Sequence, residues 1–296
     1  MADGLVLTRR VSGQGVHESA QRAGSGQCAS VVDRYVGYEE WTGAGFCRRE
    51  VARCGLALIL GFGDAMDVFD DEHGGPGRTL HAFVVGNQSH SSVTSVAGHQ
   101  LGVQVELTPV GALTLFGDVE TFNDAVVPLE DVLGERGAEL TARLAALPLW
   151  GQRLDFLDAT FGSRDADDLP ALSPEVEWLR LRLIASAGRE RVEPLMDQTG
   201  WSRRLVTERF RRQLGVPPKA YARLLRFGYA SALLAAPGSG RTVADAAMEA
   251  GYYDQSHLTR DFVSLAGVTP GAFVAQADSA PEVRFVQDAV DAVRAH

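Results

Sequence analysis

The sequence predicts an α+β fold, with a β-rich N-terminal part, a helical hairpin after it and a C-terminal part made only of helices. Three observations support this prediction. At 296 residues, the chain is long enough for two domains, each with its own hydrophobic core. Up to about residue 127, short apolar and β-branched runs alternate with turn residues. From Pro128 onward, apolar residues recur at steps of three and four, which is the period of a helix.

The N-terminal strands are predicted from five runs rich in β-branched and aromatic residues. Clusters of Gly, Asp and Asn bound them, and the runs cover residues 5–8, 30–38, 56–60, 79–85 and 103–107. Strands at this spacing are typical of a barrel or a sandwich. Between Leu129 and Phe161, the leucines repeat with a helical period, so we expect amphipathic helices that pack on these strands.

A polar, Pro-punctuated stretch separates this part from the rest of the chain. It includes Asp165 to Asp168 and is followed by Pro170 and Pro174. We therefore expect a β-rich domain with its helices over 1–165, a linker over 166–173, a helical domain over 174–276 and a C-terminal helix within 277–296.

The helical domain repeats itself. Its predicted helices cover residues 174–187, 192–199, 202–214, 218–235, 243–250, 254–266 and 271–276, with a last one at 281–295. A shift of 51 residues places Val192 on Val243 and Gly200 on Gly251, and a shift of 52 places Phe210 on Phe262. One helix-turn-helix unit therefore occurs twice. The 18-residue connector 218–235 would span roughly 27 Å as a helix, against ~34 Å between successive major grooves on one face of DNA.

Charge is distributed unevenly between the two parts. The net charge is −10, but residues 189–276 contain 12 basic and 8 acidic side chains, a net charge of +4, and the remainder has −14. A basic module on an acidic body indicates an anionic partner for the module.

The second helix of each unit has the residues that could contact DNA. In the first unit five arginines, at 203, 204, 209, 211 and 212, surround an inward stripe and are accompanied by one acid, Glu208. In the second unit Gln255, Ser256, Thr259 and Arg260 lie outside the inward stripe. Arginine pairs with phosphate and with guanine O6 and N7, and glutamine pairs with adenine N6 and N7.

The repeated unit and the residues of its second helices resemble those of a known family. The segment Gly251-Tyr-Tyr-Asp-Gln-Ser-His-Leu-Thr-Arg-Asp-Phe-Val-Ser-Leu-Ala-Gly-Val-Thr-Pro-Gly-Ala-Phe273 is similar to the C-terminal signature of AraC/XylS-type transcription regulators, and Gly200 to Tyr221 resembles the first half of the same module. The resemblance covers about residues 174 to 276. It implies a bacterial regulator with a double helix-turn-helix DNA-binding domain and an N-terminal sensor or dimerisation domain with a cupin-like barrel.

The resemblance also places the base-contacting positions. They fall on Arg204, Thr207 and Glu208 in the first unit and on Gln255, Ser256 and Arg260 in the second. Glu208 departs from the basic residue common in the family. Its carboxylate could accept a hydrogen bond from cytosine N4, or it could pair with Arg204 or Arg212 on its own helix.

The full set of predicted DNA-binding residues combines these positions with their neighbours. His257 is included, although a structural role beside Leu258 is an equal alternative. The set is Arg203, Arg204, Thr207, Glu208, Arg211, Arg212, Gln255, Ser256, His257, Thr259 and Arg260. The expected partners are double-stranded promoter or operator DNA, a small-molecule effector that the sequence does not identify, a second copy of the chain in a homodimer, and RNA polymerase.

An enzyme is the alternative function class. His73, His81, His90 and His99 lie among the predicted strands and could indicate a cupin-type metal enzyme whose helical tail binds a partner. They lack the spacing of a metal motif, and no catalytic motif is present, so we expect no enzyme activity, metal or cofactor. Cys47 and Cys54, with three arginines between them, could form a low-pKa redox pair, but buried thiols are the favoured interpretation.

No segment of the sequence predicts a membrane span or a signal peptide. The longest apolar run, residues 55–63, is about half the length of a spanning helix. The first thirty residues lack the apolar core of a secretory signal. We therefore expect a cytoplasmic protein with no membrane partner.

Overall fold

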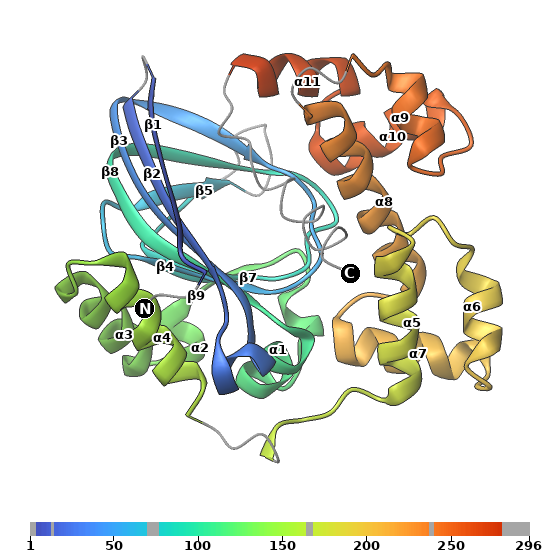
Figure 1. The fold of residues 1–296 in the computed structure, drawn as a ribbon, viewed down its shortest axis with the longest axis horizontal. Coiled ribbons are helices and arrows are strands. Elements are labelled where there is room, and N and C mark those ends of the chain that lie inside the picture. The colour runs from blue at the N-terminus through green and yellow to red at the C-terminus, as the bar shows by residue number, and fades with distance from the viewer. Residues whose placement is uncertain (1–3, 13–14, 70–76, 164–167, 237–239, 280–296) are drawn as a thin grey trace.

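The computed structural model describes residues 4–12, 15–69, 77–163, 168–236 and 240–279. Among these residues, nine antiparallel strands form one strongly curved sheet (Figure 1). The strand order is β1-β2-β3-β8-β4-β7-β9, and β5 and β6 extend it from β8. The strands are β1 (Val6–Ser12), β2 (Gly15–Ala23), β3 (Val32–Glu50), β4 (Ala57–Gly61), β5 (Met66–Phe69), β6 (Arg78–Leu80), β7 (Ala82–Val85), β8 (Ser92–Leu107) and β9 (Val126–Pro128).

The long central pair, β3 and β8, gives the sheet two different faces. Successive side chains of a strand point to opposite faces. Tyr35 and its cross-strand partner Val105 are buried in the main core, together with Leu58 and Leu60 of β4. The alternate positions present charged and polar groups, and we call this the polar face of the sheet: Arg34, Tyr38, Glu40, Gln104 and Glu106.

Three helices cover the apolar face of the sheet (Figure 1): α2 (Leu129–Leu133), α3 (Glu135–Ala146) and α4 (Trp150–Phe161). Leu144 and Leu154 from these helices are fully buried in the same core as the strands. A Cβ atom at Gly37 of β3 would lie 2.5 Å from the Trp150 ring, so the close approach of α4 requires a glycine there.

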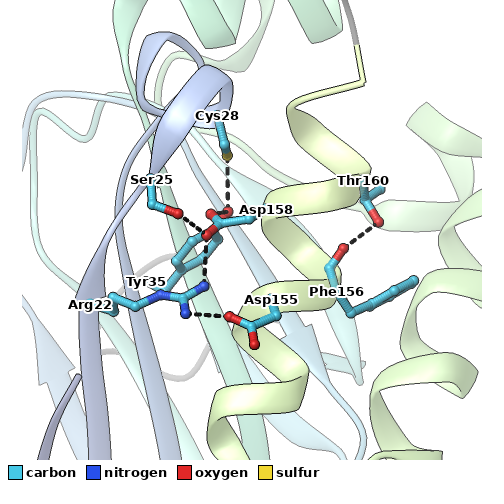
Figure 2. A network of polar contacts seen from close by, with 8 residues as sticks. All are labelled: Arg22, Ser25, Cys28, Tyr35, Asp155, Phe156, Asp158 and Thr160. Carbon is cyan, nitrogen blue, oxygen red and sulfur yellow. Dashed lines mark hydrogen bonds and ion pairs between the residues drawn. The ribbon is translucent and has the colours of Figure 1, made fainter. Parts of the chain in front are cut away.

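A buried ion-pair network joins α4 to the sheet (Figure 2). Arg22 of β2, whose side chain is 6% exposed, binds Asp155 at 2.5 Å and Asp158 at 2.7 Å. Asp158 also accepts hydrogen bonds from the Tyr35 hydroxyl at 2.9 Å and from Ser25, just before the short helix η1 (Gly26–Ser30). The network therefore ties β2, β3 and the segment before η1 to one turn of α4.

The C-terminal part is all helical, as predicted. It consists of α5 (Pro174–Ala185), α6 (Val192–Gln198), α7 (Arg203–Leu214), α8 (Pro218–Ala235), α9 (Val243–Glu249), α10 (Gln255–Ala266) and α11 (Pro270–Ser279). One apolar core joins α5, α6 and α7, and a second joins α9, α10 and α11. The connector α8 contributes to both, with Tyr221 in the first core and Phe227 in the second.

The α+β prediction is confirmed, and each predicted helix from residue 174 to residue 276 is found with ends within three residues. The sequence reasoning missed β2, β5, β9 and the helix α1 (Pro109–Phe116), and the predicted strand 79–85 is divided into β6 and β7. The helix predicted at 281–295 lies outside the described residues. The domain limits stay predictions. No helix in the described ranges is both long and apolar enough to cross a membrane.

Candidate nucleic-acid interface

The two helix-turn-helix units have matching local structure. The units are α6 with α7 and α9 with α10. Gly200 and Gly251, which form the two turns, both have φ of 76°. Such positive values strain any residue with a side chain, so a glycine is needed at each turn.

Both second helices begin and end in the same way. The side chains of Ser202 and Asp254 cap the N-termini of α7 and α10 by accepting hydrogen bonds from backbone N–H groups. Gly215 and Gly267 end the helices with φ of 83° and 69°. The sequence repeat is therefore a structural repeat with equivalent helix ends.

The first of the two helices, α7, presents most of its predicted residues to solvent. Val206, Phe210 and Leu214 are buried, and Arg204, Glu208 and Arg212 are exposed on the remaining surface. Thr207 is half-buried, and its hydroxyl donates to the Arg203 carbonyl at 2.8 Å. The exposed guanidinium groups are therefore free to approach a duplex from the side opposite to the core.

Two arginines of α7 already have carboxylate partners. Arg203 forms a bidentate pair with Asp197 of α6, with distances of 2.8 and 2.7 Å, and both side chains are more than half exposed. Arg211 pairs with Glu120, in the short helix η2 (Glu120–Phe122) of the N-terminal part. A phosphate at either arginine would compete with the carboxylate for the guanidinium group.

The second helix, α10, exposes its N-terminal turns. Gln255, Ser256 and Arg260 are exposed. Thr259 is half-buried and donates to the Gln255 carbonyl at 2.9 Å, which is the same bond that Thr207 makes in α7. The repeat therefore places a threonine with the same internal hydrogen bond at equivalent positions of both helices.

His257 contacts other residues of the second unit. Its ring is half-buried and packs edge-on against the Tyr252 ring, with 5.0 Å between the centroids. Its backbone N–H donates to the capping carboxylate of Asp254 at 2.7 Å. Of the two alternatives for this residue, the structural one has direct contacts to support it.

One exposed residue of this surface was missed by the sequence reasoning. Tyr253 lies in the turn before α10 and is 93% exposed, the largest exposed fraction among the apolar and aromatic side chains that the structure describes as exposed. It directly precedes the capping residue Asp254. The position of Tyr253 next to the capping residue could have indicated an exposed aromatic side chain. Its neighbour Tyr252 is buried, however, and the sequence alone does not show which of the two tyrosines is exposed.

The connector is joined to the second unit by an ion pair whose carboxylate is buried. Arg223 of α8 donates from Nε and Nη2 to Oδ1 of Asp261 in α10, both at 2.9 Å, and the Asp261 side chain is 7% exposed. Arg226 of the same helix lies over the Tyr252 ring at 5.5 Å. These contacts fix α10 against α8.

The comparisons with known proteins agree with this geometry. The family model described as a helix-turn-helix domain matches residues 195–276. The HTH-type transcriptional activator RhaR of Klebsiella pneumoniae is 31% identical over 142 residues, which are 48% of this chain and 47% of RhaR, so the chain spans about half the length of this relative. The C-terminal part therefore contains a helix-turn-helix domain.

Two solved structures resemble the chain at low TM-scores. ToxT from Vibrio cholerae has a TM-score of 0.46 at 10% identity, covering 81% of this chain and 97% of ToxT. A probable AraC family transcriptional regulator from Rhodopseudomonas palustris has a TM-score of 0.33 at 29% identity, covering 36% of this chain and 98% of that one. The second similarity covers about the length of the helix-turn-helix domain alone.

Ionisable groups are concentrated on the polar face of the sheet. Arg34 and Arg53 lie 2.8 and 3.7 Å from the carboxylate of Glu106, and the Gln104 amide donates to it at 2.7 Å. Burial by itself would raise the pKa of Glu106, but the charges of Arg53 and Arg34 outweigh burial and hold it below its ordinary value. Glu106 is thus a largely buried carboxylate whose ionised form is favoured by its partners.

A second charged group lies farther along the same face. Glu40 accepts from Arg48 at 2.8 Å and lies 2.9 Å from His17 Nδ1. Burial opposes its ionisation, but His17 and Arg48 outweigh burial and lower the pKa of Glu40. The neighbouring hydroxyl of Tyr38 is buried without a hydrogen-bond partner in the described part of the chain, and burial raises the pKa of Tyr38.

The histidines proposed as metal ligands lie apart in the sheet. His99 binds Glu39 at 2.9 Å and stacks on Trp41, and His90 lies 3.7 Å from Asp124. His81 is exposed, and His73 lies outside the described residues. Within the described ranges, no three or more His, Cys, Asp or Glu side chains are grouped so that they could hold a metal ion.

Proposed function

We propose that this protein is a sequence-specific, double-stranded DNA-binding transcription regulator that works in the cytoplasm. The main support is the pair of equivalent helices α7 and α10. Each has a capped N-terminus, one buried apolar face and one exposed face. Their exposed residues can form hydrogen bonds with base edges. The connector α8, roughly 27 Å long at 1.5 Å per residue, is of the order of the ~34 Å between successive major grooves.

The proposed base contacts are Arg204, Thr207 and Glu208 from α7 and Gln255, Ser256 and Arg260 from α10. Arg204 and Arg260 suit guanine, and Gln255 suits adenine. Arg203, Arg211 and Arg212 would bind phosphates, and Thr259 would support α10 through its internal hydrogen bond. His257 would act through its packing on Tyr252.

We also propose that a small ligand controls the N-terminal part. The polar face supports this proposal, because the buried hydroxyl of Tyr38, which has no hydrogen-bond partner in the described part of the chain, is costly to keep without a polar partner. The charged and polar side chains of the polar face favour a polar ligand that forms hydrogen bonds. A homodimer and a contact with RNA polymerase belong to the same proposal.

Salt-titrated selection of bound DNA from a genomic library tests the proposed function. The full chain is expected to enrich one motif with contacts in two successive major grooves, and its affinity should fall steeply between about 50 and 200 mM salt. The variant Arg204→Ala is expected to lose the preference for one base pair within the first half of the motif. Equal binding to all sequences, or a flat response to salt, would overturn the proposal.

A further inference from the structure

Three loops of the N-terminal part are bound together into one surface, which we call the platform: residues 51–55, 86–89 and 120–125. The backbones of Arg53 and Gln88 exchange hydrogen bonds of 3.2 and 2.9 Å. The Asn87 side-chain oxygen accepts from the Gly55 N–H at 2.9 Å, and the Asn87 backbone carbonyl accepts from the Asp124 N–H at 2.8 Å. Because each loop is bonded to another, the platform can act as a single rigid support.

The platform binds the C-terminal end of the first DNA-facing helix, α7. The side-chain amide of Asn87 donates to the Leu214 carbonyl at 3.1 Å, and that of Asn123 donates to the Gly215 carbonyl at 2.6 Å. Asn87 also donates to the Asn123 side chain at 2.9 Å. Carbonyls at a helix C-terminus lack partners within the helix, so the two asparagines complete this helix end from another part of the chain.

Gly215, which ends α7, lies directly against the two asparagine side chains. A Cβ atom at Gly215 would lie 2.4 Å from Asn87 Nδ2 and 2.9 Å from Asn123 Oδ1. Gly215 also has a φ of 83°, which disfavours any side chain. Glycine at this position therefore avoids a strained backbone and leaves the two asparagine amides in place.

The same platform also binds the second DNA-facing helix, α10. The Ala52 N–H donates to the Leu265 carbonyl at 2.8 Å, and Val51 and Ala52 belong to the apolar core of the second unit. In the repeat, Leu265 is equivalent to Gln213, one residue before Leu214. The platform therefore holds both helices at the same end and leaves Arg204, Gln255 and Arg260 exposed.

From this arrangement we infer that Asn87 and Asn123 are positioning residues for DNA binding, which fix the direction of α7 relative to α10. The inference rests on the proposed function. The connector α8 sets how far apart the two helices lie, and the platform sets the angle between them. The separation of the two DNA half-sites that the protein accepts is thus determined partly by its N-terminal part.

The test uses the full chain and duplexes built from the motif that it selects, with the two half-sites moved apart or together by one and two base pairs. The wild type is expected to prefer one separation by about tenfold or more. The double variant Asn87→Ala/Asn123→Ala should bind all separations within about threefold of one another, with unchanged affinity for each isolated half-site. A residue that only supports folding would instead weaken binding equally to every duplex.

Two further variants keep the test decisive. Asn123→Asp has the same shape but lacks the N–H donor, and it should relax the preference even if the double variant does not fold. Ser89→Ala removes only the hydrogen bond from the Ser89 hydroxyl to Asp124 within the platform and should keep the wild-type preference. If a folded Asn123→Asp variant keeps the wild-type preference for one half-site separation, the inference is overturned but the proposed function is not. If the wild type selects no motif, both the inference and the proposed function are overturned.

Discussion

Arg211 of α7 forms an ion pair with Glu120 of the N-terminal part, so an arginine on a helix that we propose to contact DNA is held by a carboxylate of another region. The arginine is 50% exposed and the glutamate 38% exposed. The pair lies beside the contacts of Asn87 and Asn123 with the end of the same helix. A phosphate and Glu120 would therefore compete for one guanidinium group.

Removing the competing charge should strengthen DNA binding. Glu120→Gln is expected to raise the affinity for the selected duplex by up to about fivefold, because an exposed ion pair contributes about 0 to 1 kcal/mol. Glu139→Gln, which neutralises an exposed acid on α3, should change the affinity less. Equal affinities for Glu120→Gln and the wild type in a fluorescence-anisotropy titration would show that Arg211 does not contact phosphate.

Arg260 is expected to provide base-specific affinity. Arg260→Ala should weaken binding to the selected duplex by about 1 to 3 kcal/mol and relax the preference at one base pair. Arg143→Ala removes the same charge from an exposed position on α3 and serves as the matched control. Binding titrations against duplexes with each base at that position distinguish the two variants, and equal losses for both would remove Arg260 from the contact set.

The buried network around Arg22 predicts very different effects for two neighbouring aspartates (Figure 2). Asp158→Ala should lower the free energy of unfolding by about 2 to 4 kcal/mol, because it removes the buried partner of Arg22 and the acceptor of the Tyr35 hydroxyl. Asp155 is 69% exposed, so Asp155→Ala should cost at most about 1 kcal/mol. Denaturant unfolding measures both, and similar losses would contradict a buried role for Asp158.

Thiol reactivity should differ among the three cysteines. Burial raises the pKa of Cys28 to about 11 and that of Cys54 to about 12, whereas Cys47 is exposed. Buried thiols were expected, and the structure shows that this expectation is wrong for Cys47.

A disulfide reagent at pH 7 should therefore modify one thiol quickly in the folded protein and all three after unfolding. Cys47→Ser should abolish the fast reaction. Fast modification of Cys54 would restore the redox-pair hypothesis.

Two glutamates of the β-rich part should respond to pH in opposite ways. Burial raises the pKa of Glu50, so its contribution to stability is present below about pH 4 and is lost as the pH rises through its folded pKa. Glu50→Gln should therefore raise Tm at pH 7 and change it little near pH 4. Glu40, whose pKa is lowered, contributes stability above about pH 4, so Glu40→Gln should lower Tm at pH 7. Shifts of the same sign in both variants at pH 7 would contradict this assignment.

Much of the helical part was predictable because its signals are local. The capping residues Ser202 and Asp254, the turn glycines and the inward stripe around Phe210 lie within a few residues of the structure they specify. The same holds for Thr242 and Asp245, which form a capping box at the start of α9. The β2 strand was missed because its sequence from Gly15 is polar and becomes a strand only by pairing with β1 and β3.

By itself, the sequence determined the α+β division, the two helix-turn-helix units and the apolar stripe along which each second helix packs. Only the tertiary structure decided that Asn87 and Asn123 complete the end of α7, that Glu120 holds Arg211 and that Asp158 neutralises Arg22. These partners are 91 to 136 residues apart. Periodicity and capping act over one or two helical turns, whereas hydrogen bonds between distant segments exist only once the folded core has brought those segments together.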